Sequence, residues 1–252
     1  MQLRDRTWIP YVPSDALSHR RPMNIWYPTE VDTGPLHLSR LGALNPLGEL
    51  TTYLLADHED NLFLGGLSMA NEPVYNQHAT AWLLRDNVPM VVRAFYSMMA
   101  CAFSHSTLEP VEHRWGWGQY FGPPSTDGAW FELYRNMLVR ETEENTLFLM
   151  QATPRAWLED GKQVRVQDVP TLYGNLSFSV VSAVKSNKMR AKIEMPMRER
   201  PKALQVRSRH PENKPIRHVR VNKGIWRNFD SEKEWVRIPA PSERHYTIEV
   251  SY

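Results

Sequence analysis

The spacing of apolar residues changes near Glu144, and this change limits the fold more than any other feature of the sequence. Before it, apolar residues recur at helical intervals, most clearly in Asp127–Arg140, which predicts amphipathic helices. The expected helices are Pro35–Leu44, Pro46–Ala56, Val74–Arg85, Pro89–Phe103 and Asp127–Arg140. After it, short segments alternate apolar and polar residues, which predicts the strands of an antiparallel β-sandwich.

We therefore predict two domains, with helices in residues 1–144 and a β-sandwich in residues 145–252. The expected strands are Thr146–Ala152, Gln163–Gln167, Gly174–Val184, Met189–Met195, Ala203–Arg209, Ile216–Val221, Trp235–Ile238 and Tyr246–Val250. A short Asn-Lys-Gly link joins Val221 to Ile225, which predicts a hairpin there. Pro154–Leu158 is expected to form one helical turn, closed by Gly161.

Charge is unevenly distributed along the chain. Residues 1–184 contain 13 Lys and Arg against 20 Asp and Glu, whereas residues 185–252 contain 17 against 8. A basic segment can bind nucleic acid or an acidic polysaccharide. Here the cations alternate with apolar residues, as in Val219-Arg220-Val221, and we favour solvated strand faces over a binding patch. We expect no nucleic-acid partner.

Compartment and oligomeric state are left open by the sequence. The chain contains one cysteine, Cys101, within an apolar run, and a small core residue is the expected role. No apolar run approaches the ~18 residues of a membrane span, and residues 1–22 lack the apolar centre of a signal peptide. We expect no membrane partner.

The segment Ser104–Arg135 contains carboxylates, aromatic residues and glycines in a mixture that suits carbohydrate. Sugar rings stack their C–H faces on aromatic rings, and their hydroxyls call for charged side chains at the rim. The candidate catalytic residues are Glu109, Glu112, Asp127 and His113. The candidate substrate-binding residues are Trp115, Trp117, Tyr120, Trp130 and Arg114, with Glu72 and Tyr75 from the run Asn71–Asn76.

Each candidate also has a structural interpretation. Hydrolysis of a glycosidic bond needs one carboxylic acid and one carboxylate, which Glu109, Glu112 and Asp127 offer. Asp127 equally suits the first turn of a helix, where the helix dipole favours a negative charge. The two glutamates equally suit ion pairs with arginine, and His113 suits a structural hydrogen bond.

Cofactors and metals are not expected. The sequence contains neither of the glycine-rich phosphate-binding motifs, and the acidic run Asp57–Asn61 lacks the spacing of a calcium loop. Leu62 stands where a zinc-binding H-E-x-x-H motif needs its second histidine.

Six segments together resemble a known family: WYPTEVDTG, LADHEDNLF, EPVYNQ, FSHSTLEPVEHRW, QYFGPPSTDGAWFELYR and ATPRAWLEDG. They are similar to the C-terminal part of six-hairpin (α/α)6 glycosidase-like proteins, a large bacterial family. The resemblance implies a toroid of twelve helices with substrate held among the loops at one end. Only about five helices fit before the strands, so we expect the chain to be a C-terminal fragment of a longer protein.

Three functions follow as hypotheses. The first is a glycoside hydrolase that uses Glu109 or Glu112 as acid or base on an oligo- or polysaccharide. The second is a polysaccharide lyase, in which His113 and Tyr120 matter more than the carboxylates. The third is a non-catalytic glycan-binding or scaffold protein that depends on the aromatic residues alone.

Overall fold

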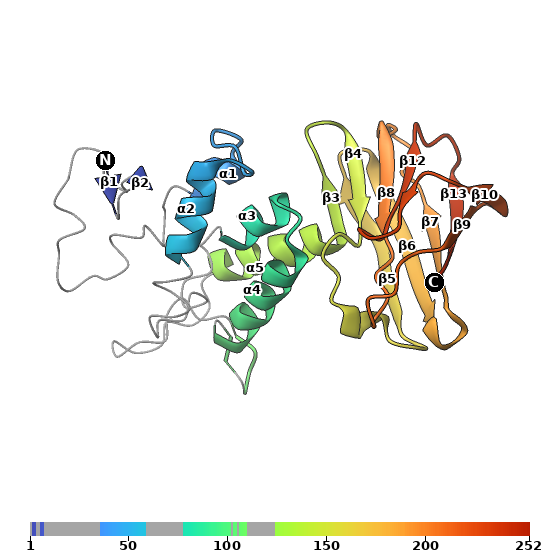
Figure 1. Ribbon diagram of the computed structural model, residues 1–252, viewed down its shortest axis with the longest axis horizontal. Helices are drawn as coiled ribbons and strands as arrows, with labels where there is room; N and C mark the ends of the chain where they lie inside the picture. The colour runs from blue at the N-terminus through green and yellow to red at the C-terminus, as the bar shows by residue number, and fades with distance from the viewer. Residues whose placement is uncertain are drawn as a thin grey trace. The chain divides into compact units, whose positions relative to one another are not determined.

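The computed structural model describes residues 2–3, 6–7, 36–58, 78–101, 103–104, 106–109 and 124–252 (Figure 1). The chain divides into two compact units, Met1–Tyr134 and Arg135–Tyr252. After a two-residue pair of strands near the start of the chain, helices come first and the two large sheets follow, so the predicted α-then-β order is confirmed. The domain boundary after residue 144 and the toroid stay predictions.

The first unit contains short helices. They are α1 (Leu36–Arg40), α2 (Glu49–His58), α3 (His78–Leu84), α4 (Val88–Cys101) and the start of α5 (Pro124–Leu138), after a two-residue pair of strands, β1 (Gln2–Leu3) and β2 (Arg6–Thr7). Each helix overlaps one that the apolar spacing predicts. Within the described residues, no helix is both long enough and apolar enough to span a membrane.

Apolar side chains from α1, α2 and α3 hold this unit together. Leu36, Leu54, Leu55 and Ala81 are buried in one cluster. The turn before α2 is fixed by polar contacts, because the Thr51 hydroxyl donates to the Asn45 carbonyl at 2.7 Å. Burial of these apolar groups is the main source of stability for such short helices.

Helix α4 corrects one expectation. Its sequence is apolar on nearly every side, which predicts a helix enclosed by other elements. In the structure only one face is buried, with Val91, Ala94 and Phe95, while Tyr96 and Met99 are each 42% exposed. The prediction of an enclosed helix is therefore wrong.

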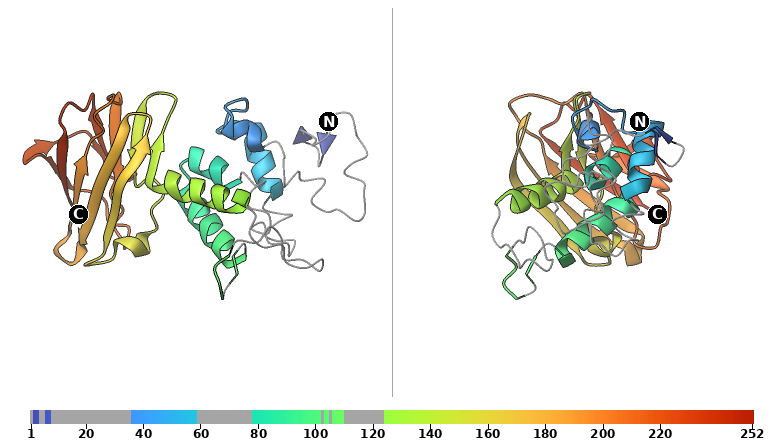
Figure 2. Two further views of the ribbon diagram at one scale, coloured as in Figure 1. Left: turned by 180° about the vertical axis from the view of Figure 1, so that it is seen from behind. Right: turned by 90° about the vertical axis from the view of Figure 1, so that its left-hand side faces the viewer.

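The second unit consists of two sheets that lie face to face (Figure 2). One has six strands in the order β10-β9-β13-β7-β6-β5, all antiparallel, and the other five in the order β11-β12-β8-β4-β3. The strands are β3 (Val139–Glu141), β4 (Thr146–Leu149), β5 (Gln163–Thr171), β6 (Gly174–Ala183), β7 (Lys188–Glu194), β8 (Ala203–Arg207), β9 (His218–Val221), β10 (Gly224–Trp226), β11 (Phe229–Asp230), β12 (Trp235–Pro239) and β13 (His245–Ser251). Short 3-10 turns, η3 (Arg155–Leu158) and η4 (Val184–Ser186), lie between strands, the first where a helical turn is predicted.

Alternation along the strands builds the core between these sheets. In β7, Met189, Ala191 and Ile193 are buried, and the residues between them are exposed. The facing sheet contributes Leu204 and Val206 from β8, among other buried residues. The outer face of the six-stranded sheet is consequently polar, as half-buried strands require.

Three features of the second unit were not expected. The strands β4 and β8 are parallel, while the other pairs of this unit, which is described throughout, are antiparallel. Residues Val139–Glu141 form β3, although the apolar spacing continues the preceding helix to Arg140. The backbone N–H of Met150 donates to the Leu138 carbonyl at 2.8 Å, so pairing with a distant segment ends the helix. The short strand β11 was not predicted, and β10 was expected only as the second arm of the hairpin at Val221–Ile225.

An ion pair fastens the end of α5 to β3. The Arg135 guanidinium donates to both carboxylate oxygens of Glu141, at 2.9 and 3.0 Å, and to the Pro170 carbonyl. Burial acts to raise the pKa of the Glu141 carboxyl, but the hydrogen bonds from Arg135 and from the Leu172 N–H outweigh it and hold that pKa below its usual value.

Candidate functional site

Most residues of the predicted carbohydrate site lie outside the described part of the chain. These are Glu112, His113, Arg114, Trp115, Trp117, Tyr120, Glu72 and Tyr75. Asp127 falls in the first turn of α5, as predicted, but the structure does not describe its side chain. Glu109 and Trp130 are described, and the roles assigned to all eleven residues stay predictions.

Glu109 lies in an exposed turn. The Thr107 hydroxyl donates to its carboxylate at 3.0 Å, and its backbone carbonyl accepts the Ser104 N–H at 2.8 Å. The carboxylate itself is open to solvent, which an acid or base acting on a polymer requires.

Trp130 lies in an aromatic cluster. Its ring stacks on Phe95 and on Tyr134, each with a centroid distance of 5.4 Å, and meets the edge of Phe103 at 5.5 Å. Its indole N–H is buried and has no hydrogen-bond acceptor among the described residues. These are the contacts of a packing residue, and they stabilise the packing of α4 against α5.

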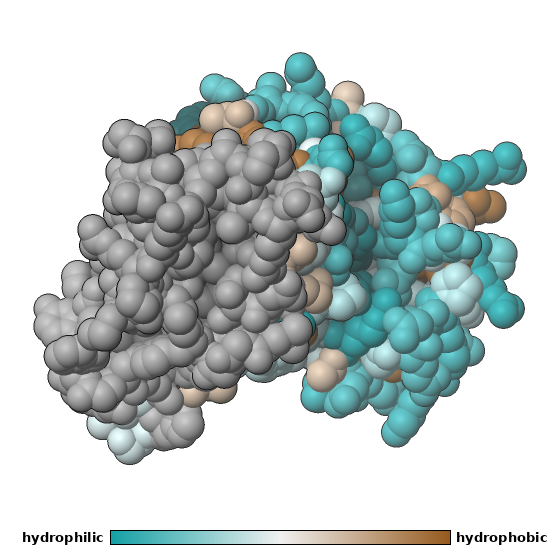
Figure 3. Space-filling model, turned by 60° about the vertical axis from the view of Figure 1, so that its left-hand side comes forward, coloured by the Kyte–Doolittle hydropathy of each residue, from teal (hydrophilic) through white to brown (hydrophobic). Residues whose placement is uncertain are grey.

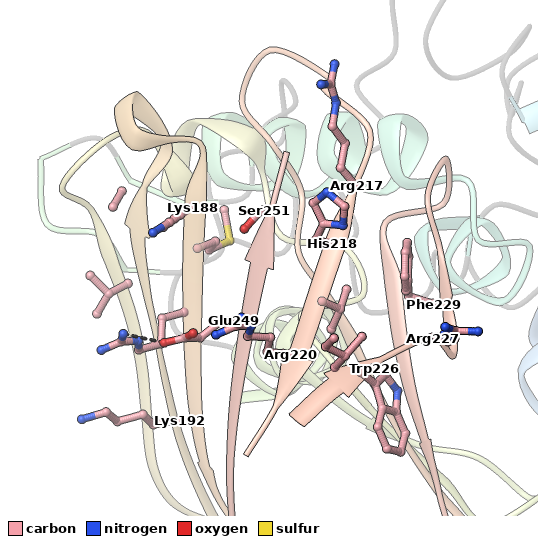
Figure 4. Close-up of a pocket in the computed structure, with 16 residues that line it drawn as sticks. Lys188, Lys192, Arg217, His218, Arg220, Trp226, Arg227, Phe229, Glu249 and Ser251 are labelled. Atoms are coloured by element: carbon pink, nitrogen blue, oxygen red, sulfur yellow. Dashed lines mark hydrogen bonds and ion pairs between the residues drawn. The ribbon is translucent and has the colours of Figure 1, made fainter. Parts of the chain in front are cut away.

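A groove of about 910 Å³ crosses the outer face of the six-stranded sheet. Figure 4 shows Lys188 and Lys192 on one side of Glu249, with Trp226, Arg227 and Phe229 on the other. The lysines and arginines that line it are Lys188, Arg190, Lys192, Arg217, Arg220 and Arg227, and the only carboxylate in the lining is that of Glu249. Every residue of this groove lies in the second unit.

Strand pairing arranges these cations in two rows. Strand β13 lies between β7 and β9 and pairs antiparallel with both. Ser251 stands opposite Lys188 on one side and His218 on the other, and Glu249 stands opposite Arg190 and Arg220 in the same way. Since strands are about 4.8 Å apart, the two rows are separated by about 10 Å across β13.

The apolar part of the groove lies at its β10 edge. The indole N–H of Trp226 donates to the Arg237 carbonyl at 3.0 Å, which fixes the orientation of the ring. Ile225 is 79% exposed next to it, and Phe229 is half-buried. Elsewhere the described surface in Figure 3 is mainly hydrophilic, with hydrophobic residues in small separate groups.

A second polar cluster lies inside the same unit and has a structural role. Glu234 is buried, and Arg155 donates to both of its oxygens at 2.8 Å. The backbone N–H of His210 donates to the same carboxylate at 2.9 Å. Because Arg155 belongs to η3 and His210 follows β8, the cluster ties together segments that are far apart in sequence, at the cost of removing charges from water.

His210 is buried in this cluster. Its Nδ1 accepts the Glu212 N–H at 3.0 Å, and its ring meets the edge of Tyr252 at a centroid distance of 4.7 Å. Burial, assisted by the charge of Lys214, lowers the pKa of the imidazole. Burial also raises the pKa of the Tyr252 phenol, which donates to the Ser208 carbonyl at 2.9 Å.

Metal ligands do not gather anywhere in the part of the chain that the structure describes. No group of three or more His, Cys, Asp or Glu side chains there could hold an ion.

The groove was not identified from the sequence. The pattern Val219-Arg220-Val221 was interpreted as a solvated strand face, and the strand itself is present. What the pattern cannot show is that Lys188 and Arg220 lie two strands apart on one face, because that depends on strand order.

Comparisons with known proteins show only distant likenesses. No protein family and no curated protein matches the sequence. Among solved structures, one described as a glycoside hydrolase is similar, with a TM-score of 0.35 and 8% sequence identity. The match covers 69% of this chain and 32% of the glycoside hydrolase chain. A structure of the GH127 beta-arabinofuranosidase BT3674 is also similar, with a TM-score of 0.37 and 10% sequence identity. That match covers 71% of this chain and 30% of the arabinofuranosidase chain. The chain thus spans less than a third of the length of these structures, and its function is inferred from its own residues.

Proposed function

We propose that this protein is carbohydrate-active and that the groove on the six-stranded sheet holds a glycan. The observation that carries the proposal is the meeting, in one groove, of a fixed indole ring, exposed aliphatic side chains and a polar strand lined by cations. A sugar presents an apolar ring face and a rim of hydroxyl and charged groups, and both parts find partners here.

Within this proposal, the reaction is hydrolysis of a glycosidic bond. Glu109 or Glu112 acts as the acid or base, with Asp127 and His113 as further candidates, in helices of the toroid type that the family resemblance implies. The exposure of the Glu109 carboxylate supports access to a polymer. Such a reaction needs two carboxyl groups about 5–5.5 Å or 6.5–9.5 Å apart, according to the stereochemical outcome.

The test is release of reducing ends from a panel of glycans, with the full chain and its variants Glu109→Gln and Glu112→Gln. Loss of an acid or base group costs ~10²–10⁴-fold in rate, so one variant should be nearly inactive. Glu144→Gln is the matched control, because Glu144 is an exposed glutamate in the turn between β3 and β4.

The outcomes separate the possible functions. Loss of release in one of the two variants, but not in Glu144→Gln, supports hydrolysis and identifies the acid or base. Unchanged release in both variants contradicts the assignment of these glutamates. Binding of a glycan without any release favours the non-catalytic glycan-binding function.

A polysaccharide lyase is the second candidate, because a groove lined by unpaired cations suits a polymer of uronic acids. In that reaction a base, His113 or Tyr120, removes the proton next to the carboxylate, and the leaving oxygen departs to give a C=C bond. The unsaturated product absorbs ultraviolet light, whereas the product of hydrolysis does not. An ultraviolet signal that is lost in His113→Ala, but kept in Glu109→Gln, would replace the hydrolase proposal by this one.

A further inference from the structure

We infer that the ligand of the groove is an anionic polysaccharide, bound along β13 between the cation rows of β7 and β9. That the ligand is a glycan rests on the proposed function. This inference adds that the glycan carries carboxylate or sulfate groups. It also commits to a binding site in the second unit, apart from the residues predicted for catalysis.

The first argument is the lack of partners for the cations. Within the described part of the chain, no ion pair or side-chain hydrogen bond involves Lys188, Lys192 or Arg220. The same holds there for Arg217 and Arg227. Like charges held on one face repel each other, and an anionic ligand removes that cost.

Other exposed cations of the same unit do have carboxylate partners. Lys162 pairs with Glu159 at 2.7 Å, and Arg244 pairs with Glu194 at 2.8 Å. Four further exposed cations of this unit also have no ion pair or side-chain hydrogen bond among the described residues, namely Arg165, Lys202, Lys223 and Lys233. The groove differs in that five cations unpaired within the described residues line it together, while its lone carboxylate, that of Glu249, is matched by Arg190.

The second argument is the shape of the charged region. Alternate residues along β7 lie about 7 Å apart, so Lys188, Arg190 and Lys192 form a line of about 14 Å. On the other side of β13, β9 contributes Arg220, Arg217 comes just before that strand, and the imidazole of His218 lies between them in sequence. A small anion needs several donors that converge on one point, whereas two rows along a strand suit an extended chain with a charge on many of its units.

The third argument favours a glycan over single-stranded nucleic acid. Proteins that bind single strands stack successive bases on aromatic rings distributed along the groove. Here the indole and phenyl rings in the lining are those of Trp226 on β10 and Phe229 on β11, which lie on the same side of Glu249 (Figure 4). The middle of the groove is formed by Glu249 and Ser251, which offer hydrogen bonds rather than stacking.

The experiment measures binding to the full chain by calorimetry. The anionic probes are polygalacturonate, alginate and chondroitin sulfate, and the neutral probe is fully methyl-esterified polygalacturonate, which has the same backbone without its charges. Oligo(dT) serves as the nucleic-acid probe. We expect binding to at least one anionic glycan, weaker binding to the neutral one, and a steep loss of affinity with added salt because exposed charges are screened.

Two matched triple variants locate the binding. Lys188→Gln with Lys192→Gln and Arg220→Gln removes three charges from the groove, and Lys202→Gln with Lys223→Gln and Lys233→Gln removes three exposed charges outside it. The first should weaken anionic binding about tenfold, and the second less than about twofold. All six side chains are exposed, so both variants should keep the wild-type unfolding curve.

Each other result overturns the inference in a recognisable way. Equal affinity for the esterified and acidic polymers leaves the glycan proposal in place and refutes the anionic class. Equal losses in the two triple variants show a general charge effect rather than a site. Binding of oligo(dT) alone assigns the groove to nucleic acid. Binding of no glycan at all refutes both this inference and the proposed groove function.

Discussion

The imidazole of His210 is buried beside an ion pair, and this position ties the stability of the protein to pH. Its Nδ1 already accepts a hydrogen bond from the backbone N–H of Glu212, so a proton on Nδ1 would point at that N–H and break the hydrogen bond. Burial lowers the pKa of the folded imidazole below the ordinary value of 6.5. The charged groups around it are Lys214, Glu212, Glu234 and Arg155.

The sign of the effect follows from proton linkage. Between the folded pKa and 6.5, the unfolded chain binds a proton that the folded chain does not. The contribution to stability is therefore complete above about pH 6.5 and is lost as pH falls. We expect the free energy of unfolding to decrease between pH 7 and pH 5, by at most about 1.4 kcal/mol per pH unit from this residue.

Urea unfolding at several pH values checks this prediction. The comparison is with His210→Asn, whose side-chain oxygen can accept the Glu212 N–H but does not titrate. The other histidines contribute equally to both proteins, so the difference between the two pH profiles reports His210. Parallel profiles would contradict the prediction.

At the scale of residues, the sequence indicates a class of chemistry more readily than a position. Arg155 belongs to a run that supports the family resemblance, and its guanidinium donates to the buried carboxylate of Glu234. Trp130 was assigned to sugar binding from its neighbours in sequence, and its ring packs against Phe95 and Tyr134. Composition cannot separate a ring that stacks on sugar from one that stacks on another ring.

Among the elements, the turn between β9 and β10 offers the sharpest test. Asn222 and Lys223 both have positive φ, 48° and 73°, as a two-residue type I′ hairpin requires. The hairpin predicted from the sequence is thus confirmed. Asn222 suits this backbone and also accepts the Thr247 N–H at 2.8 Å, whereas lysine at the second position is strained.

We expect Lys223→Gly to raise the free energy of unfolding by about 0.5–1 kcal/mol. Relief of the left-handed backbone favours glycine, and the greater freedom of glycine in the unfolded chain takes back part of the gain. The control is Lys233→Gly, because Lys233 is exposed and has no positive φ, so the same change should lower stability there. Urea unfolding of both variants is the measurement, and destabilisation by Lys223→Gly would contradict the argument.

Strands and helices were predictable where the information is local. Apolar spacing predicts the described helices and the longer strands, since each has one buried face. It fails at β3, because the pairing of Val139–Glu141 with β4 overrides a helical pattern. It also fails for the parallel pairing of β4 with β8, which joins segments more than 50 residues apart and leaves no mark in either sequence.

For the whole molecule, the division into two compact units predicts that residues 124–252 fold alone. This piece keeps α5 intact together with both sheets, and its core is formed by its own strands. We expect a β-type circular dichroism spectrum and a single cooperative transition in urea. A gradual transition, or a spectrum of an unfolded chain, would show that the sheets depend on the preceding helices.

The candidate site also belongs to this larger scale. Lys188 and Arg220 lie 32 positions apart in sequence, and β13, which lies between their strands, comes last in the chain. Charge counts reveal that residues 185–252 are basic, but only strand order brings the charges to one face. A site assembled in this way cannot be read from any single motif.

The placement of β13 between β7 and β9 has a consequence for selectivity. The backbone ladders set the interval between the cations, because both rows are paired to the same strand. That interval is the spacing of the Cα atoms, which does not change when lysine replaces arginine. For the anionic polysaccharide that we propose as ligand, we therefore expect two glycans of equal charge density but different spacing of their acidic groups to bind with different affinity.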